Sequence, residues 1–268
     1  TVKENALKVL FVGDNYQLPP VKDVCSIFDG SLATYTLTQV HRQKGDNPIL
    51  DKAIEYREFI KGNLKEMPEL KTAINASGEG IHVMPDYSFV DVFKKTYKEY
   101  VAGSIVDVPM CTYTNVSAIN YNNMIRKVAY FMEGAVEPFY VGERLVSNSM
   151  VSNNDKVILN NNEMVTVKEF YTGQYEGIDG YHVHVDGDYN KTLESYNETV
   201  FSPATSTSAN KVLAKLKKVA KKSNDRMDWK AFYGVQDALA DLRPPFAGTT
   251  HKSQGGTFPA VFIDQLDI

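Results

Sequence analysis

Short segments of the chain carry side chains that could bind phosphates. The first, GDNYQLPPV from Gly13, places a carboxylate at Asp14 and an amide at Gln17 directly after an apolar run. There an Asp can order a metal-bound water and a Gln can sense a phosphate, although the same residues also suit a plain turn that ends at the prolines. The second, TQVHRQ from Thr38, places Arg42 after an expected strand. Its guanidinium could reach a phosphate or simply pair with a carboxylate.

A third segment, GTTHKSQGG from Gly248, is more specific. Its small residues let the backbone approach a ligand closely, and Thr250, His251 and Lys252 supply hydroxyl, imidazole and ammonium groups that suit phosphates. For His251 the alternative is a buried, hydrogen-bonded histidine. The segment therefore predicts an anion-binding loop.

The elements that must position these segments alternate between strands and helices. Residues 7–13 read as a buried parallel strand that delivers the first loop at its C-terminal end. Further strands are expected at 33–38, 80–84, 106–113 and 260–263, and helices at 48–61, 88–101 and 115–131. This alternation predicts a parallel sheet covered on both faces.

From about Val136 the pattern changes. Two-residue alternation recurs at 156–159, 164–167 and 181–186, between turns rich in Asn and Gly, which predicts a small antiparallel barrel or sandwich inserted into the α/β fold. Residues 209–222 then form an amphipathic helix with six lysines, and more helix follows to about Leu239. These lysines fit either a solvated helix face or a surface that contacts a nucleic-acid strand.

Length and composition indicate a soluble globular protein. The 268 residues are 43% hydrophobic and no apolar run is long enough to span a bilayer. Cys25 and Cys111 are the only cysteines, too few for a disulfide framework, so a reducing, cytoplasmic setting is expected. The net charge of −4 argues against a generic polyanion-coating protein, but residues 129–203 carry −8 and residues 204–252 carry +6. The basic stretch is the first candidate for binding a polyanion.

In this order and at this spacing, GDxxQLPPV, the Arg-Gln pair and TxHKSQG resemble motifs III, IV and V of superfamily 1 helicases, in the RecD-like 5′-to-3′ branch. The closest likeness is to a phage helicase of that branch, which would place the chain in a host cytoplasm. The segment from Cys111 to Lys127 is similar to the part of that family in which a strand ends in Thr-Asn and a helix follows. The likeness covers nearly the whole chain, and its specificity lies in these segments.

The resemblance implies a RecA-like parallel-sheet domain that is interrupted by an inserted SH3-like β-barrel with a helical extension. Residues 1–34 would end a first RecA-like domain, and residues 35–135 and 241–268 would form the second. The barrel would span 136–205 and the helical extension 206–240.

The resemblance also assigns roles. Gln17 would contact the γ-phosphate of ATP or the attacking water, Arg42 would act as an arginine finger, and Gly255 would close its loop near the nucleotide. Asp14 would lie at the same nucleotide site or only shape its loop. The phosphates of single-stranded DNA would be held by Thr114, Asn115, Thr250, His251 and Lys252.

The sequence departs from the family in two places. It contains no Gly-Lys dipeptide to cradle phosphates and no adjacent Asp-Glu pair to hold Mg²⁺. It also begins at Thr1 and stops at Ile268, before an Arg-containing motif VI. We therefore expect a monomeric piece of a longer helicase, with ATP and Mg²⁺ bound mainly by the missing N-terminal part, that does not hydrolyse ATP alone.

Its expected partners are single-stranded DNA and replication or recombination proteins. Two other functions remain open from the sequence. One is a non-catalytic module that binds nucleic acid or a replication protein, and the other is a viral-type superfamily 1 RNA helicase.

Overall fold

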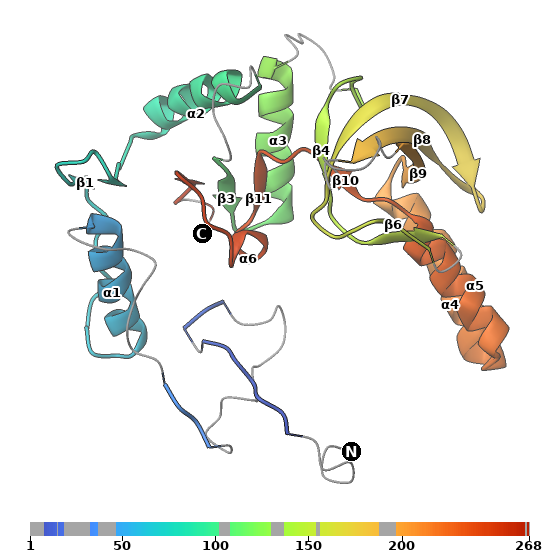
Figure 1. Cartoon of the computed structure of the whole chain (residues 1–268), viewed down its shortest axis with the longest axis horizontal. Helices are drawn as coiled ribbons and strands as arrows, with labels where there is room; N and C mark the ends of the chain where they lie inside the picture. The colour runs from blue at the N-terminus through green and yellow to red at the C-terminus, as the bar shows by residue number, and fades with distance from the viewer. Residues whose placement is uncertain are drawn as a thin grey trace. The chain divides into compact units, whose positions relative to one another are not determined.

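A computed structural model describes residues 8–14, 16–18, 33–36, 47–101, 108–129, 137–153, 156–187, 197–265 and 267 (Figure 1). The chain divides into two compact units, Thr1–Asp91 and Val92–Ile268, which are described separately. No helix in the described part of the chain is both long enough and apolar enough to cross a membrane.

The described elements of the first unit are one helix and one short hairpin. Helix α1 (Pro48–Ile60) begins where the side chain of Asn47 accepts a hydrogen bond from the N–H of Ile49 (2.9 Å), and Pro48 suits the first turn. Strands β1 (Ala73–Ile74) and β2 (Gly80–Ile81) pair antiparallel. The helix expected at 48–61 is confirmed, whereas the strand expected at 80–84 is only two residues long.

The expected buried strand at 7–13 is wrong for its described residues. Residues 8–14 form no strand, and the side chains of Leu10 and Val12 are 86% and 87% exposed. Residues 33–36, from a second expected strand, are likewise exposed and irregular. Among the described residues of this unit, neither segment pairs with a strand, and a strand forms only where a partner pairs with its backbone N–H and C=O groups.

A three-stranded parallel sheet forms the centre of the second unit. Strand β3 (Met110–Thr112) lies between β11 (Ala247–Thr249) and β12 (Phe262–Ile263), and both neighbours run parallel to it. Helix α3 (Asn115–Ala129) follows β3, and the short helix α6 (Thr250–Ser253) follows β11. The expectation of a mixed α/β fold with a parallel sheet is confirmed.

Aromatic side chains form the core beside this sheet. Helix α2 (Asp86–Val101) contributes Phe93, which is fully buried, and its ring meets those of Tyr97, Tyr121 and Phe262 edge-on at centroid distances of 4.7, 5.3 and 5.3 Å. Edge-on contacts of this kind are favourable beyond the area they bury. The cluster therefore holds α2, α3 and β12 together around β3.

An antiparallel insertion separates α3 from β11. Its five-stranded sheet has the order β10-β4-β7-β8-β9, and a two-stranded hairpin of β5 and β6 packs nearby (Figure 1). The strands are β4 (Arg144–Ser147), β5 (Val151–Asn153), β6 (Lys156–Leu159), β7 (Met164–Tyr175), β8 (Ile178–Gly187), β9 (Asn197–Pro203) and β10 (Leu242–Arg243). Valines and leucines from β4 to β9 form its core with Phe139 and Ala240.

The sequence predicted a small antiparallel barrel or sandwich here, and no closed barrel is found in the described residues. The five-stranded sheet has free ends at β10 and β9, which do not pair with each other. Instead, Leu239 forms a bridge with Phe201 of β9, and the N–H of Ala240 donates to the carbonyl oxygen of Phe201 (2.8 Å). The chain that leaves the helical extension thus covers the edge that a barrel would have closed.

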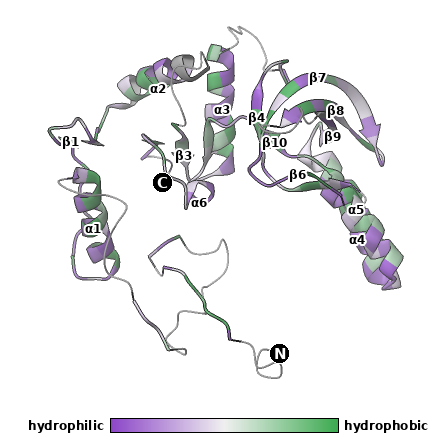
Figure 2. Cartoon of the chain, in the orientation of Figure 1, coloured by the Kyte–Doolittle hydropathy of each residue, from purple (hydrophilic) through white to green (hydrophobic). Residues whose placement is uncertain are grey.

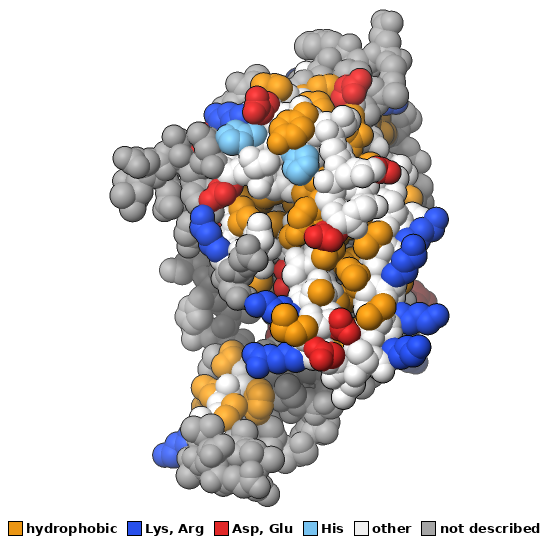
Figure 3. Space-filling view, turned by 90° about the vertical axis from the view of Figure 1, so that its right-hand side faces the viewer, with side chains coloured by type: hydrophobic (Ala, Val, Ile, Leu, Met, Phe, Trp, Pro, Cys, Tyr) orange, Lys and Arg blue, Asp and Glu red, His pale blue; other side chains and the backbone are white. Residues whose placement is uncertain are grey.

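A helical hairpin extends from this sheet, as expected from the sequence. Helix α4 (Ser206–Ser223) is capped by Thr205 and ends at Asn224 in the left-handed conformation, and helix α5 (Arg226–Ala238) returns beside it. Hydrophobic and hydrophilic residues alternate along both helices (Figure 2). In the space-filling view of Figure 3, Lys and Arg side chains gather along the right-hand edge. The exposed lysines of α4 are Lys211, Lys215, Lys217, Lys218, Lys221 and Lys222.

A buried ion pair joins α3 to the insertion. Arg126 of α3 donates from Nε and Nη2 to the two carboxylate oxygens of Glu143 (2.6 and 2.9 Å), just before β4. The backbone N–H of Tyr140 donates to the same carboxylate (3.1 Å), and Arg126 also donates to the carbonyl oxygen of Pro138 (3.2 Å). This buried pair connects the parallel sheet's helix to the first strand of the antiparallel sheet.

Candidate functional site

The C-terminal ends of β3 and β11 bring together two segments that are far apart in sequence. Because the two strands are parallel and adjacent, Thr114 and Asn115 emerge at the same edge of the sheet as residues 250–252. The hydroxyl of Thr250 donates to the carbonyl oxygen of Thr112 (3.1 Å), which ties the two loops to each other. Five of the predicted phosphate-binding residues therefore lie at one edge.

The carboxylate of Asp267 already accepts hydrogen bonds from the backbone N–H groups at the start of α3. The N–H groups of Tyr113 and Thr114 donate to Asp267 (2.7 and 3.4 Å), as does the hydroxyl of Ser117 (2.5 Å). These bonds, the one from Ser117 first, lower the pKa of Asp267. The hydroxyl of Thr114 accepts from the N–H of Ser117 (3.1 Å) and so caps the helix. Thr114 is thus engaged within the protein, whereas Asn115 beside it is exposed.

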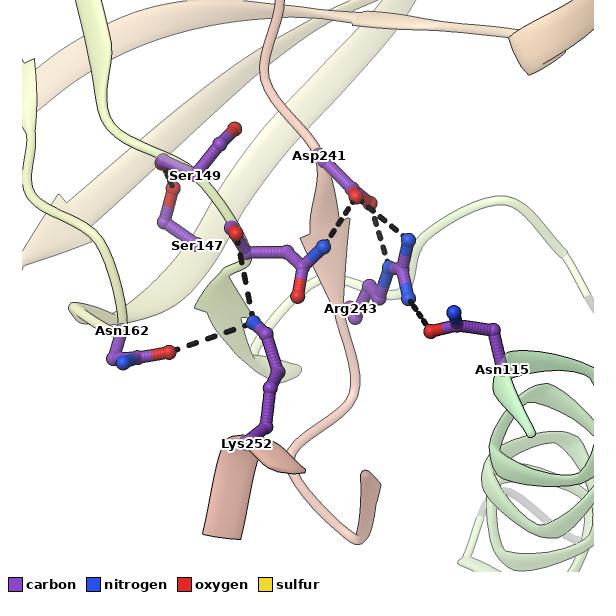
Figure 4. A network of polar contacts seen from close by, with 8 residues as sticks. Asn115, Ser147, Ser149, Asn162, Asp241, Arg243 and Lys252 are labelled. Carbon is purple, nitrogen blue, oxygen red and sulfur yellow. Dashed lines mark hydrogen bonds and ion pairs between the residues drawn. The ribbon is translucent and has the colours of Figure 1, made fainter. Parts of the chain in front are cut away.

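Lys252 reaches from α6 to the insertion (Figure 4). Its Nζ donates to the carbonyl oxygen of Asn148 and to Oδ1 of Asn162, both at 3.5 Å. Among the described residues, no carboxylate lies within ion-pair distance of this ammonium group. Burial lowers the pKa of Lys252, and the charge of Arg243 lowers it further, against the opposing effect of Asp241. An anion bound beside Lys252 would stabilise its charged form against both the burial and the repulsion from Arg243.

His251 and Gly255 flank this lysine. The His251 side chain is half-buried on α6. Gly255 has φ +86°, which favours glycine, and a Cβ there would meet no atom within 4 Å. The positive φ explains why a glycine stands at position 255. Its contact with a nucleotide stays a prediction.

The predicted nucleotide-binding residues are divided between the two units, with Asp14 and Gln17 in the first and Gly255 in the second, and their common site stays a prediction. Oδ1 of Asp14 accepts from the N–H of Tyr16 (3.0 Å), its Oδ2 lies 3.5 Å from Arg57, and the N–H of Gln17 donates to its carbonyl oxygen (3.2 Å). Asp14 therefore shapes its own loop. Arg42 lies outside the described residues. No group of three His, Cys, Asp or Glu side chains suited to a metal occurs among the described residues, and the binding of ATP with Mg²⁺ stays a prediction.

The edge also contains charged residues that the sequence did not single out. Asp241 and Arg243 form a bidentate pair through Nε to Oδ1 (2.8 Å) and Nη2 to Oδ2 (2.7 Å). Nη1 of Arg243 donates to Oδ1 of Asn115 (3.2 Å). The only sequence signal is an Asp-Leu-Arg tripeptide just before Pro244, where the prolines indicated a break and nothing more. The edge thus has two neighbouring cations, Arg243 and Lys252, and two carboxylates, Asp241 on Arg243 and Asp267 at the start of α3.

No protein-family model matches the chain, and no curated protein matches it. The motifs and the geometry of this edge are therefore what indicate a function. Amide and cationic groups from separate segments converge there, and their N–H groups can bind an anion.

Proposed function

We propose that this chain is part of a RecD-like superfamily 1 helicase and that the edge of its parallel sheet holds the backbone of single-stranded DNA. In this proposal the parallel sheet is the second RecA-like domain, and the antiparallel insertion is a module of the SH3-like kind with a helical extension. The main support is the convergence of Asn115 after β3 with Thr250 and Lys252 after β11.

The chemistry of the edge suits a backbone rather than a particular base. Hydroxyl, amide and ammonium donors bind phosphate oxygens, which are the same at every nucleotide, so the grip would be independent of sequence. The edge contributes Arg243 and Lys252 to the +6 of residues 204–252, while six of the other basic residues of that segment are lysines of α4. Translocation requires such sequence-independent contacts.

The second candidate function is a nucleic-acid-binding module that does not hydrolyse ATP. The residues predicted to bind the nucleotide favour it. The sequence has no Gly-Lys dipeptide, and Asp14 is engaged with Tyr16 and Arg57 rather than directed to a metal. Both candidates predict the same nucleic-acid site, and they differ in whether ATP is hydrolysed.

Lys252→Gln is expected to weaken binding of a labelled oligo(dT) by about tenfold at low salt, because it removes a charged hydrogen-bond donor to phosphate. The slope of log K against log salt should fall by about 0.7, the value for one phosphate contact on a single strand. Fluorescence anisotropy over a salt series measures both quantities.

The matched control is Lys218→Gln, which removes the same charge from an exposed position on α4. Its effect should be smaller than that of Lys252→Gln. Equal effects of the two variants, or no binding by the unmodified chain, would contradict the proposed site. An oligo(U) of equal length tests the RNA-directed alternative, which predicts tighter binding to RNA than to DNA.

The chain is expected to release no phosphate from MgATP in the presence of single-stranded DNA. Hydrolysis by this family requires a phosphate-cradling lysine and carboxylates that hold Mg²⁺, and the sequence contains neither motif. A coupled phosphate-release assay measures the rate. Turnover that Gln17→Ala abolishes would show that the chain has a complete catalytic site and would overturn this expectation.

A further inference from the structure

Arg243 lies at the joint between the two sheets. It ends β10, which pairs antiparallel with β4, and Pro244 and Pro245 then lead directly to β11 of the parallel sheet. Figure 4 shows its guanidinium beside Asn115, at the edge that also holds Lys252. A residue outside all the recognised motifs thus lies within the proposed nucleic-acid site.

The guanidinium is bound but not saturated. Nε and Nη2 donate to Asp241 and Nη1 donates to Asn115, which accounts for three of the five N–H groups of an arginine. The side chains of Arg243 and Asp241 are 33% and 43% exposed. Solvent, and therefore a phosphate, can reach the pair.

Asp241 can release Arg243 without becoming unpaired. Its Oδ2 also accepts from Nδ2 of Asn148 (2.6 Å), while the N–H of Asn148 donates to the carbonyl oxygen of Asp241 (2.7 Å). A phosphate offers the guanidinium the same paired oxygen geometry as a carboxylate. A phosphate can therefore replace Asp241 at the guanidinium while Asp241 keeps its hydrogen bond from Asn148.

We propose that Arg243 is a phosphate-binding residue of the nucleic-acid site and that Asp241 competes with the phosphate for its guanidinium. Arg243, Lys252 and Asp241 together carry a net positive charge, while Asp267 is held separately by the N–H groups at the start of α3. Asn115 accepts from the guanidinium on the side away from Asp241. Asp241 thereby lowers the affinity of the free chain for a polyanion. This inference rests on the proposed function.

Opposite effects of two substitutions test the inference. With oligo(dT) as the probe, Arg243→Gln should weaken binding about tenfold and lower the salt slope by about 0.7. Asp241→Asn should strengthen binding about two- to fivefold, because an asparagine amide keeps the acceptor for Asn148 but no longer neutralises Arg243. Arg243→Lys should retain the salt slope and lose part of the affinity, since the charge remains and the planar fork does not.

The double variant Asp241→Asn/Arg243→Gln separates competition from simple charge repulsion. Competition predicts that Asp241→Asn gains nothing once Arg243 is absent, whereas simple repulsion by the carboxylate predicts the same gain in both backgrounds. Equal gains in both backgrounds, or unchanged affinity in Arg243→Gln, would overturn the inference. If Lys252→Gln still weakens binding in that case, the proposed function stands and only the role of Arg243 fails. Thermal melts of each variant confirm that it is folded.

Discussion

Glu143→Leu is expected to destabilise the second unit by about 3–5 kcal/mol, the usual effect of removing one partner from a buried ion pair. The side chains of Arg126 and Glu143 are only 7% and 1% exposed. Leucine fills the space of the glutamate but leaves the guanidinium with one carbonyl acceptor, Pro138. Because an arginine cannot lose its proton in a protein, the buried charge remains. Urea denaturation followed by circular dichroism measures the loss.

The reverse substitution, Arg126→Met, should be less damaging because Glu143 can take up a proton. Burial raises the pKa of Glu143 above its ordinary 4.5, although Arg126 opposes the rise. In Arg126→Met that opposition is gone, so the folded state holds the proton more tightly than the unfolded chain. The variant should be most stable below the unfolded pKa and lose stability as the pH rises through the folded one.

Two further variants serve as controls for the prediction on Glu143→Leu. The double variant Arg126→Met/Glu143→Leu should recover much of the loss, because an apolar pair of similar size replaces both charges. Glu198→Gln breaks an ion pair with Lys156, which is 69% exposed, and should cost no more than about 1 kcal/mol. A loss in Glu143→Leu no larger than that of Glu198→Gln would show that the buried pair does not stabilise the joint.

Local sequence patterns predicted the helices well because their start and stop signals lie within the helices themselves. Asn47 and Pro48 begin α1, and Thr205 begins α4. The apolar run at 8–13 misled for the opposite reason: a strand is defined by its partner, and the run itself carries no information about one. How the antiparallel sheet ends could not be predicted for the same reason, because Leu239 meets β9 through a contact between residues far apart in the sequence.

The residues of the candidate site also fall into two groups, those that local sequence predicts and those that it does not. Thr250, His251 and Lys252 were found because their types and adjacency already suit phosphates. Asp241 and Arg243 could not be found, because their position depends on the pairing of β10 with β4, almost a hundred residues earlier in the chain. Long-range pairing thus supplies the second cation of the edge, and the motif supplies the first.

Phe93→Ala is expected to destabilise the second unit by about 3–5 kcal/mol, the range for removing a fully buried phenylalanine. Among the described residues, its ring meets that of Phe262, which belongs to β12. Loss of the ring leaves a cavity between α2 and the sheet, so amide hydrogen exchange should rise first at β12, whose N–H at Phe262 donates to Pro109 (2.9 Å). Urea denaturation gives the total loss, and exchange locates it.

Phe93→Leu is the control for this cavity, because it keeps most of the apolar volume and should cost clearly less than Phe93→Ala. The comparison also separates folding from binding. Phe93 does not touch the cluster of Asn115, Arg243 and Lys252, so at temperatures where Phe93→Ala remains folded it should bind oligo(dT) as the unmodified chain does. A folded Phe93→Ala with weakened binding would show that the edge depends on the exact position of β12, and the proposed site would then have to include that strand.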